Sequence, residues 1–374
     1  MRVTFQAARA NCEAPIVPKT IEICLPVRNE EKRIEAVLSA IRAQTFKDFA
    51  VHIYDNGSED RTVALARKFQ NDFDLEVRTR TRNIGQNSNV NRSFANCTSP
   101  YVALLSGNDI VAENYLQSLF ARLDSDSSAV CAHPKEVRID EHGRPAARQY
   151  STFSSVTDND PVDRACRSIA TYGKVSQFFA LYRRSALERA RPQPFGFGGD
   201  HVMACEIALY GKVLYTDDTF MKCGPSPGEN ESLSARVRHL LKVFSMDWER
   251  GLPVDSKLGR FEHFTPTIDM FHAHIDMFRL ADIPHEMRER LIVEGTRALF
   301  RRWGRRIGGH IQRIVPVLRA IGDLPQSGDL LSQILLFHAL RKADECLLLV
   351  RSPDLIEIRN RLSRLLSAAN ENLP

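Results

Sequence analysis

Three short polar segments lie between hydrophobic runs in the first third of the chain. They are residues 55–58 (DNGS), 83–85 (NIG) and 106–109 (SGND). Carboxylate and amide side chains gathered at one edge of a sheet suit a ribose, a base edge and a metal ion bound to a diphosphate. Such hard oxygen ligands favour Mg²⁺ or Mn²⁺. Each segment alone is an ordinary turn, and only their order and spacing together indicate a site.

The elements that must position these segments alternate between strands and helices from Ile21 to about His133. Short hydrophobic runs predict the strands, and apolar residues at helical spacing predict the helices. The predicted strands are residues 21–25, 51–54, 75–78 and 101–105, and the predicted helices are 30–44, 59–69 (with Ser58 as N-cap) and 112–123. This alternation is typical of an α/β domain with a parallel sheet, in which ligands bind at the carboxyl ends of the strands.

The remainder of the chain has two kinds of pattern. Residues 140–175 are polar and irregular, and we predict a long loop beside the site. From about Ser232 onward the pattern is almost wholly helical, after a segment rich in proline and glycine at 224–228. The predicted division is an N-terminal extension (1–20), an α/β domain (21–228) and an α-helical C-terminal domain (229–374).

The composition is that of an ordinary soluble globular protein, with 43% hydrophobic and 26% charged residues among 374. Disordered and fibrous classes are therefore excluded. No stretch approaches the roughly 20 apolar residues of a membrane span, and we expect no signal peptide. The formal charge of +5 does not imply nucleic-acid binding. The eight cysteines occur singly, so buried thiols in a reducing cytoplasm explain them better than disulfides or zinc sites.

Residues 21–123 resemble the nucleotide-sugar-binding half of the inverting glycosyltransferases with the GT-A fold, of the family 2 type. The similarity is carried by residues 25–31 (LPVRNEE), 38–45 (LSAIRAQT), the segment around Asp55 and residues 83–101. A second part of the family pattern follows at residues 178–187, 198–201, 206 and 210–213. The resemblance implies a mixed, Rossmann-like sheet with flanking helices, followed here by a mainly helical C-terminal domain.

The resemblance also implies which residues hold the donor. Asp55 would contact the nucleobase, usually uracil. The base and ribose would be lined by Pro26, Val27, Arg28 and Glu30, with Gly85 in the adjoining segment. Arg28 stands where the family commonly has a tyrosine, and its guanidinium plane can still stack on a base.

The metal motif of the family, D-x-D, falls on residues 106–108, so a serine and an amide replace its two carboxylates. Asp109 keeps the negative charge of this segment and is the predicted metal ligand, with Asn108 as a neutral oxygen donor. Such a site would hold Mg²⁺ or Mn²⁺ weakly and mostly through the phosphates of the donor. The alternative is a site that is metal-independent or inactive.

An acidic pair stands in the family where Gly199 and Asp200 stand here, and its aspartate is the general base. Asp200 matches this pattern and Gly199 does not. A carboxylate on the acceptor side can take the proton of the attacking hydroxyl. The alternative is that Asp200 caps a helix from His201 to Tyr210, and both roles can hold at once. Candidate basic residues for the diphosphate are Lys222, Arg236 and Arg238, while His239 is better explained as a core or solvated histidine.

Other sequence patterns give weaker evidence of function. Residues 224–228 fit G-x-S-x-G, but Pro227 lacks the N–H that an oxyanion hole requires. The histidines at 263, 272, 274 and 285 are better explained as core or solvated residues than as zinc ligands. Residues 300–319 are rich in arginine, and a solvated basic face on a helical bundle is favoured over contact with anionic lipid. The C-terminal helices suit homo-oligomerisation or acceptor binding.

The sequence thus predicts a cytoplasmic, hexosyltransferase-type enzyme that moves a sugar from a nucleotide diphosphate donor to an acceptor hydroxyl with inversion. A UDP-sugar is the expected donor, and a glycan, lipid-linked glycan or protein the acceptor. Lipid contact would place the enzyme at the inner face of the membrane. The competing prediction is a non-catalytic nucleotide-sugar-binding or scaffold protein, because the metal motif is weakened and Gly199 lacks an acid. Nucleotidyl transfer is disfavoured, since no glycine-rich basic phosphate loop opens the chain.

Overall fold

The structure of the protein is a computed structural model. It describes residues 18–140, 143–147, 149, 154–172, 177–194, 198–224, 266–323, 330–350 and 352–371. Most of the predicted extension 1–20 and the predicted boundary at 228/229 lie outside these residues, so that division stays a prediction. The candidate basic residues Arg236 and Arg238, and also His239 and His263, lie outside them as well.

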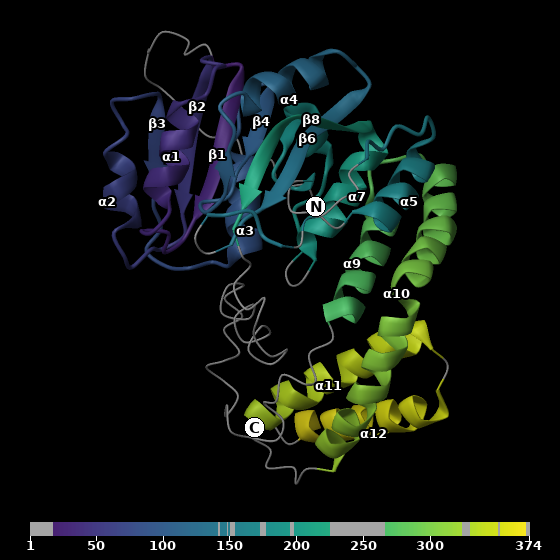
Figure 1. The fold of residues 1–374 in the computed structure, drawn as a ribbon. Coiled ribbons are helices and arrows are strands. Elements are labelled where there is room, and N and C mark those ends of the chain that lie inside the picture. Colours follow the sequence, from purple (N-terminus) through teal and green to yellow (C-terminus); the bar gives the residue numbers. More distant parts are fainter. Residues whose placement is uncertain are drawn as a thin grey trace, which may run out of the picture.

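An eight-stranded sheet forms the frame of the N-terminal half (Figure 1). Its order is β3-β2-β1-β4-β7-β6-β8-β5. The strands are β1 (Ile21–Val27), β2 (Phe49–Asp55), β3 (Leu75–Arg78), β4 (Tyr101–Leu104), β5 (Ile110–Val111), β6 (Ala129–Arg138), β7 (Leu181–Arg183) and β8 (Lys212–Cys223). Strands β1 to β4 pair with one another in parallel. Strand β7 is antiparallel to β4, and β5 is antiparallel to β8. The mixed sheet is therefore confirmed: parallel pairing joins β1 to β4 and also β6 to β8, and antiparallel pairing joins the rest.

Helices cover the sheet and form the C-terminal half. They are α1 (Ile34–Arg42), α2 (Thr62–Arg67), α3 (Gln86–Ala95), α4 (Tyr115–Asp124), α5 (Pro161–Thr171), α6 (Arg184–Arg189), α7 (Gly199–Tyr210), α9 (Pro266–Leu280), α10 (His285–Gly322), α11 (Leu330–Leu349) and α12 (Pro353–Glu371). No helix in the described part of the chain combines the length and hydrophobicity that crossing a bilayer requires.

One hydrophobic core joins the two halves. It contains buried side chains of α5 and α7 together with those of α9 to α12, for example Val162, Val202, Phe278, Trp303 and Leu355. Figure 1 shows α9 and α10 running beside α7 and α5. The helix α9 is thus packed directly against α7, the helix that carries Asp200, and α10 is packed against α5.

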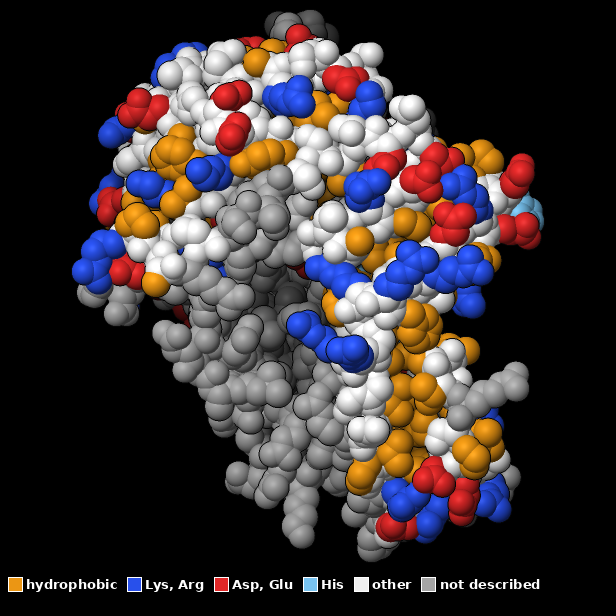
Figure 2. All heavy atoms as spheres, turned by 45° about the vertical axis from the view of Figure 1, so that its right-hand side comes forward, with side chains coloured by type: hydrophobic (Ala, Val, Ile, Leu, Met, Phe, Trp, Pro, Cys, Tyr) orange, Lys and Arg blue, Asp and Glu red, His pale blue; other side chains and the backbone are white. Residues whose placement is uncertain are grey.

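The arginine-rich part of α10 contributes its apolar side to this core. Trp303, Ile307, Ile311 and Ile314 are buried there, whereas Arg301, Arg305 and Arg306 are exposed. Figure 2 shows basic side chains gathered over this side of the molecule, next to a strip of hydrophobic ones. This arrangement matches the favoured explanation, a solvated basic face on a helical bundle. Lipid contact and oligomerisation stay predictions.

The prediction of a long loop over residues 140–175 is wrong, because α5 lies within it. Asp160 is the N-cap, and its carboxylate accepts hydrogen bonds from the N–H groups of Val162 (2.8 Å) and Asp163 (3.0 Å). Pro161 occupies the first helical position, where its missing N–H costs nothing. Val162, Ala165 and Ile169 form its buried side. The Asp-Pro pair at 160–161 is the local signal for this helix within a polar segment.

Ser58 was also misassigned as a helix N-cap. The helix α2 begins only at Thr62, after Arg61, and the Ser58 hydroxyl accepts a hydrogen bond from the backbone N–H of Asn29 (2.9 Å). The serine therefore joins two loops at the edge of the sheet instead of starting a helix.

Candidate active site

Asp55 is fixed at the last position of β2, beside the end of β1. The strand register pairs it with Val27, and the N–H of Asn56 donates to the Val27 carbonyl (2.9 Å). The N–H of Ser58 donates to both carboxylate oxygens of Asp55 (3.2 and 3.3 Å). Only 2% of Asp55 is exposed. The carboxylate is therefore held in one orientation at the carboxyl edge of the sheet.

The segment after β1 interlocks with the segment that leads into α2. Asn29 adopts φ = +54°, its side-chain oxygen accepts from the N–H of Glu59 (2.9 Å), and its own N–H donates to Ser58. The N–H of Glu30 donates to the Thr62 hydroxyl (2.7 Å). Residues Pro26, Val27, Arg28 and Glu30, predicted to line the nucleoside, are thus brought next to Asp55.

Arg28 is half-buried at the edge of this segment. Its guanidinium is within 3.6 Å of the Glu59 carboxylate, and Glu59 itself is largely exposed. An ion pair this open to solvent contributes little to stability, so a ligand can take over the guanidinium without a large cost.

Asn56 brings the predicted segment 83–85 to the same place. Its amide nitrogen donates to the Asn83 side-chain oxygen (2.7 Å) and the Gly85 carbonyl (3.2 Å), and its oxygen accepts from the N–H of Ile84 (2.9 Å). Gly85 has φ = +89°, a conformation that favours glycine, and it leads directly into α3. Asn89 on α3 then donates to the Tyr54 carbonyl (2.6 Å), which ties the helix to the end of β2.

The segment 106–109 lies directly against the end of β1. A methyl group added to Gly107 would be 2.9 Å from Val27 Cγ1 and 3.1 Å from Glu30 Cγ, so a side chain there does not fit without movement. Within this segment, the Ser106 hydroxyl donates to the Asn108 side-chain oxygen. The two residues that replace the motif's carboxylates are therefore bonded to each other.

Asp109 is 8% exposed and has neighbours of the same charge. Burial raises its pKa to about 7 together with the charges of Glu136 and Glu30, against the opposing effects of the Gly224 N–H and the charge of Arg33. Burial, with a smaller contribution from the charge of Asp60 and against the charge of Arg33, likewise raises the pKa of Glu30 to about 7. A cation placed among these carboxylates would favour their charged forms.

Glu136 is a site residue that the sequence analysis did not identify. It is buried on β6, where it pairs in register with Met221 of β8, and its charge acts on Asp109. A charged residue within a strand whose other side chains are mostly buried was the available signal.

Asp200 stands in the first turn of α7, so the alternative that it is the N-cap of a helix starting at His201 is wrong. Gly198 is the N-cap, with φ = +79°, and no side chain caps the helix. Burial raises the pKa of Asp200, while the N–H of His201 and the hydroxyl of Tyr172 oppose the rise. The Tyr172 hydroxyl donates to Asp200 Oδ2 (3.3 Å). A carboxylate in the first turn also benefits from the helix dipole.

Close packing around Gly199 explains why no acidic side chain stands before Asp200. It also shows which element lies next to Asp200 at the start of α7. A methyl group at Gly199 would lie 2.7 Å from the side-chain nitrogen of Asn87 and 2.9 Å from the Pro194 carbonyl oxygen. Asn87 belongs to the first turn of α3, just after Gly85. The start of α7 therefore abuts the start of α3, which Asn56 connects to Asp55.

Comparison with known proteins agrees with this arrangement. The model of the family described as Glycosyl transferase family 2 matches residues 22–191. The matched segment includes Asp55 and Asp109 and ends before Asp200. The chain is 24% identical to the glycosyltransferase AglE of Haloferax volcanii, over 58% of this chain and 71% of AglE.

The chain is a glycosyltransferase, and its residues 22–191 resemble family 2.

Two further similarities are informative about extent and fold. This glycosyltransferase is 22% identical to the GalNAc(5)-diNAcBac-PP-undecaprenol beta-1,3-glucosyltransferase of Campylobacter jejuni, over 47% of this chain and 55% of the relative. It also resembles the solved structure of S. aureus TarS residues 1–349, with 14% identity, a TM-score of 0.55, and coverage of 94% of this chain and 90% of TarS 1–349. The GT-A fold expected from the sequence is thereby confirmed.

Proposed function

We propose that this glycosyltransferase moves a sugar from a UDP-sugar to an acceptor hydroxyl with inversion at the anomeric carbon. The observation that carries the proposal is the interlocking of the segments around Asp55, Glu30, Gly85 and Gly107 at one edge of the sheet. Structures of S. aureus TarS 1–349 in complex with UDP and with UDP-GlcNAc, at TM-scores of 0.55 and 0.56, support a uridine donor.

In this proposal Asp55 binds the base. The N3–H of uracil can donate to this buried carboxylate, which cannot turn away because the N–H of Ser58 already holds it. Pro26, Val27, Arg28 and Glu30 line the base and ribose, and Gly85 lets the backbone approach. The Arg28 guanidinium provides a flat cationic surface for stacking.

The residues around Asp109 fit a divalent cation. Asp109 and Glu30 have raised pKa values because burial and neighbouring acids disfavour their charged forms, and a cation would relieve that repulsion. Asp109 with Asn108 would hold Mg²⁺ or Mn²⁺ together with the diphosphate. When bound, the cation supplies charge neutralisation for the departing diphosphate.

Asp200 is the proposed general base. Inversion in a single displacement needs one carboxylate on the acceptor side, to take the proton of the attacking hydroxyl. Burial raises the pKa of Asp200, which makes it a stronger base once it is ionised. A positioned base contributes about 10²–10⁴-fold to the rate.

The acceptor is proposed as a hydroxyl on a glycan, lipid-linked glycan or protein. The printed name of the Campylobacter relative specifies an undecaprenol-linked glycan, and this favours the lipid-linked class. A scaffold protein that binds the donor without using it is the second candidate, because a serine and an amide stand at residues 106 and 108.

Release of UDP separates the two candidates. A panel of UDP-sugars is first scored by the rise in melting temperature with Mn²⁺, since a ligand that binds the native state stabilises it. The donor with the largest rise is then assayed for UDP release, and the product's anomeric configuration is determined by NMR. An enzyme releases UDP and inverts the configuration, whereas a scaffold shows the thermal shift with no UDP.

A further inference from the structure

Arg302 of α10 holds the end of α5. Its guanidinium donates hydrogen bonds to the carbonyl oxygens of Ile169 and Tyr172, and a third to His201 Nε2 (3.0 Å). The last carbonyls of a helix have no partner within that helix and favour a cation. One arginine from the C-terminal half therefore fixes the residue that follows α5, Tyr172.

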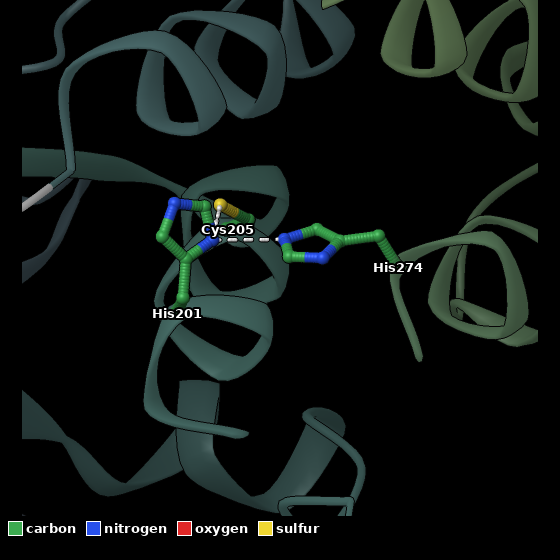
Figure 3. A group of neighbouring side chains, drawn as sticks. All are labelled: His201, Cys205 and His274. Atoms are coloured by element: carbon green, nitrogen blue, oxygen red, sulfur yellow. Dashed lines mark hydrogen bonds between the residues drawn. The ribbon is translucent and has the colours of Figure 1, made fainter. Parts of the chain in front are cut away.

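The proton positions in the neighbouring histidines follow from their partners. His274 Nδ1 lies 2.7 Å from the Met270 carbonyl, which can only accept, so Nδ1 carries the proton. His274 Nε2 then accepts from His201 Nδ1 at 2.9 Å, which leaves His201 Nε2 to accept from Arg302. The chain of hydrogen bonds runs from α10 through α7 to α9 in one direction (Figure 3 shows its two histidines).

Both histidines are held neutral. Burial lowers the pKa of His201 well below its usual value, and His274 and Arg302 lower it further. Burial also lowers the pKa of His274, to about 4. Neutral rings are the forms that this direction of donation requires.

A metal site made of His201, Cys205 and His274 is the competing interpretation, since their ligand atoms lie within 4.8 Å of one another. A metal on His201 Nδ1 would require the proton on Nε2, where it would face an N–H of Arg302. Burial also raises the pKa of the Cys205 thiol to about 12, which disfavours a thiolate ligand. The hydrogen bonds therefore favour a structural chain over a metal site.

Tyr172 connects this chain to the proposed base. Its carbonyl accepts from Arg302, its ring packs edge-on against His201 with centroids 4.8 Å apart, and its hydroxyl donates to Asp200 Oδ2 (3.3 Å). Tyr172 is 4% exposed, so packing restricts its ring. The position of the hydroxyl is thus set by contacts that come from α10 and α7.

We propose that Tyr172 is a positioning residue for the general base Asp200, and that Arg302 holds Tyr172 in place from the C-terminal helices. This inference rests on the proposed role of Asp200. It assigns the C-terminal half a part in catalysis: α10 fixes the group that orients and stabilises the ionised carboxylate.

The other titratable groups that face Asp200 are few among the described residues. Besides burial, the charge of Asp200 raises the pKa of Tyr182 on β7 and of Cys205 on α7, whereas His201 acts on Asp200 through its backbone N–H. Tyr182 donates its hydroxyl to the Phe178 carbonyl (2.6 Å) and has no hydrogen bond to Asp200. It is therefore a matched control for Tyr172, because both are buried tyrosines near the same carboxylate.

The test measures the titration of Asp200 directly, in the full chain labelled with ¹³C at aspartate side chains. The Asp200 signal is the one missing in Asp200→Asn. In Tyr172→Phe the midpoint is expected to rise by about one pH unit, because a donor to the charged form is lost. Tyr182→Phe is expected to leave the midpoint unchanged. An unchanged midpoint in Tyr172→Phe, with a native melting temperature, would overturn the proposal.

Two further measurements test the role of Arg302 and the hydrogen-bond chain separately. Arg302→Lys keeps the charge but loses the planar fork, and a rise of the Asp200 midpoint in the same direction is expected. No rise would remove Arg302 from the inference. One zinc per chain in the purified protein, lost in His274→Ala, would contradict the hydrogen-bond chain. If Asp200→Asn keeps full turnover, the proposed function fails instead, whatever Tyr172→Phe does to the titration.

Discussion

Val27 and Asp55 occupy paired final positions of two parallel strands, so the residue that ends β1 and the proposed base-binding acid share one edge of the sheet. The other site segments are attached to this pair. Asn56 binds the segment of Gly85, and Gly107 packs against Val27 and Glu30. The predictions below test what this edge binds and how it acts.

Asp55→Asn should weaken UDP binding by about 10- to 100-fold, because a charge-assisted hydrogen bond to the base becomes a neutral one. The amide oxygen can still accept from the N–H of Ser58, so the loop should keep its shape. Titration calorimetry with UDP and Mn²⁺ measures the change. Asp72→Asn is the control, because it removes an exposed carboxylate that pairs with Arg42 and is not part of the proposed site. Equal affinities for Asp55→Asn and the unmodified protein would remove Asp55 from the site.

Asp109→Asn should stabilise the metal-free protein while weakening Mn²⁺-dependent donor binding. The folded-state pKa of Asp109 is raised to about 7 by burial and by Glu136, so its ionisation costs stability as the pH rises from about 4 through about 7. The difference in melting temperature should therefore be near zero at pH 4 and largest at pH 8. Thermal melts without metal and calorimetry with it provide both readouts. A variant that is destabilised at pH 8, or that binds donor and Mn²⁺ normally, would contradict the metal role.

Gly199→Ala should lower stability by about 1–3 kcal/mol, and Gly199→Glu should lower activity although it restores the acidic pair of the family. The added carbon would meet Asn87 and the Pro194 carbonyl at the junction of α3 and α7. Gly304→Ala is a matched control, because it also adds a methyl group to a helix but meets only Phe300, at 3.7 Å. Urea unfolding measures both variants. If the two alanine variants are equally stable, the close contact is not what keeps a glycine at 199.

The sequence was sufficient for the part of the site that depends on local order along the chain. Strand β3 has the predicted bounds, and the segments of Asp55, Gly85 and Asp109 could be placed at one edge, because parallel strands end on the same side. The antiparallel pairing of β7 with β4 and β6 could not be predicted, since no local pattern specifies the direction of a distant partner strand.

The missed site residues are those whose role depends on distant partners. Glu136 matters because β6 brings it to Asp109, and Tyr172 matters because α5 ends beside Asp200. In sequence Arg302 is one more arginine of a basic helix, whereas in the structure it is half-buried, unlike the exposed Arg301 and Arg305, and binds two carbonyls. Spacing along the chain cannot separate such a residue from its exposed neighbours.

Asp200→Asn should reduce turnover by about 10²–10⁴-fold while leaving donor affinity within a factor of about two, because the base acts on the acceptor hydroxyl and not on the nucleotide. UDP release and calorimetry with the same donor measure the two quantities. Asp276→Asn is the control, because it removes another carboxylate, on α9 next to α7. It should change neither turnover nor donor affinity. Unchanged turnover in Asp200→Asn would exclude the residue as the base.

A crystal structure of Asp200→Asn with Mn²⁺ and the UDP-sugar selected by thermal shift tests the central claim most directly. We expect the uracil on Asp55, the diphosphate and the cation beside Asn108 and Asp109, and the residue at 200 facing the anomeric carbon from the side opposite the diphosphate. A nucleotide bound away from Asp55, or a residue 200 turned away from the sugar, would contradict the account.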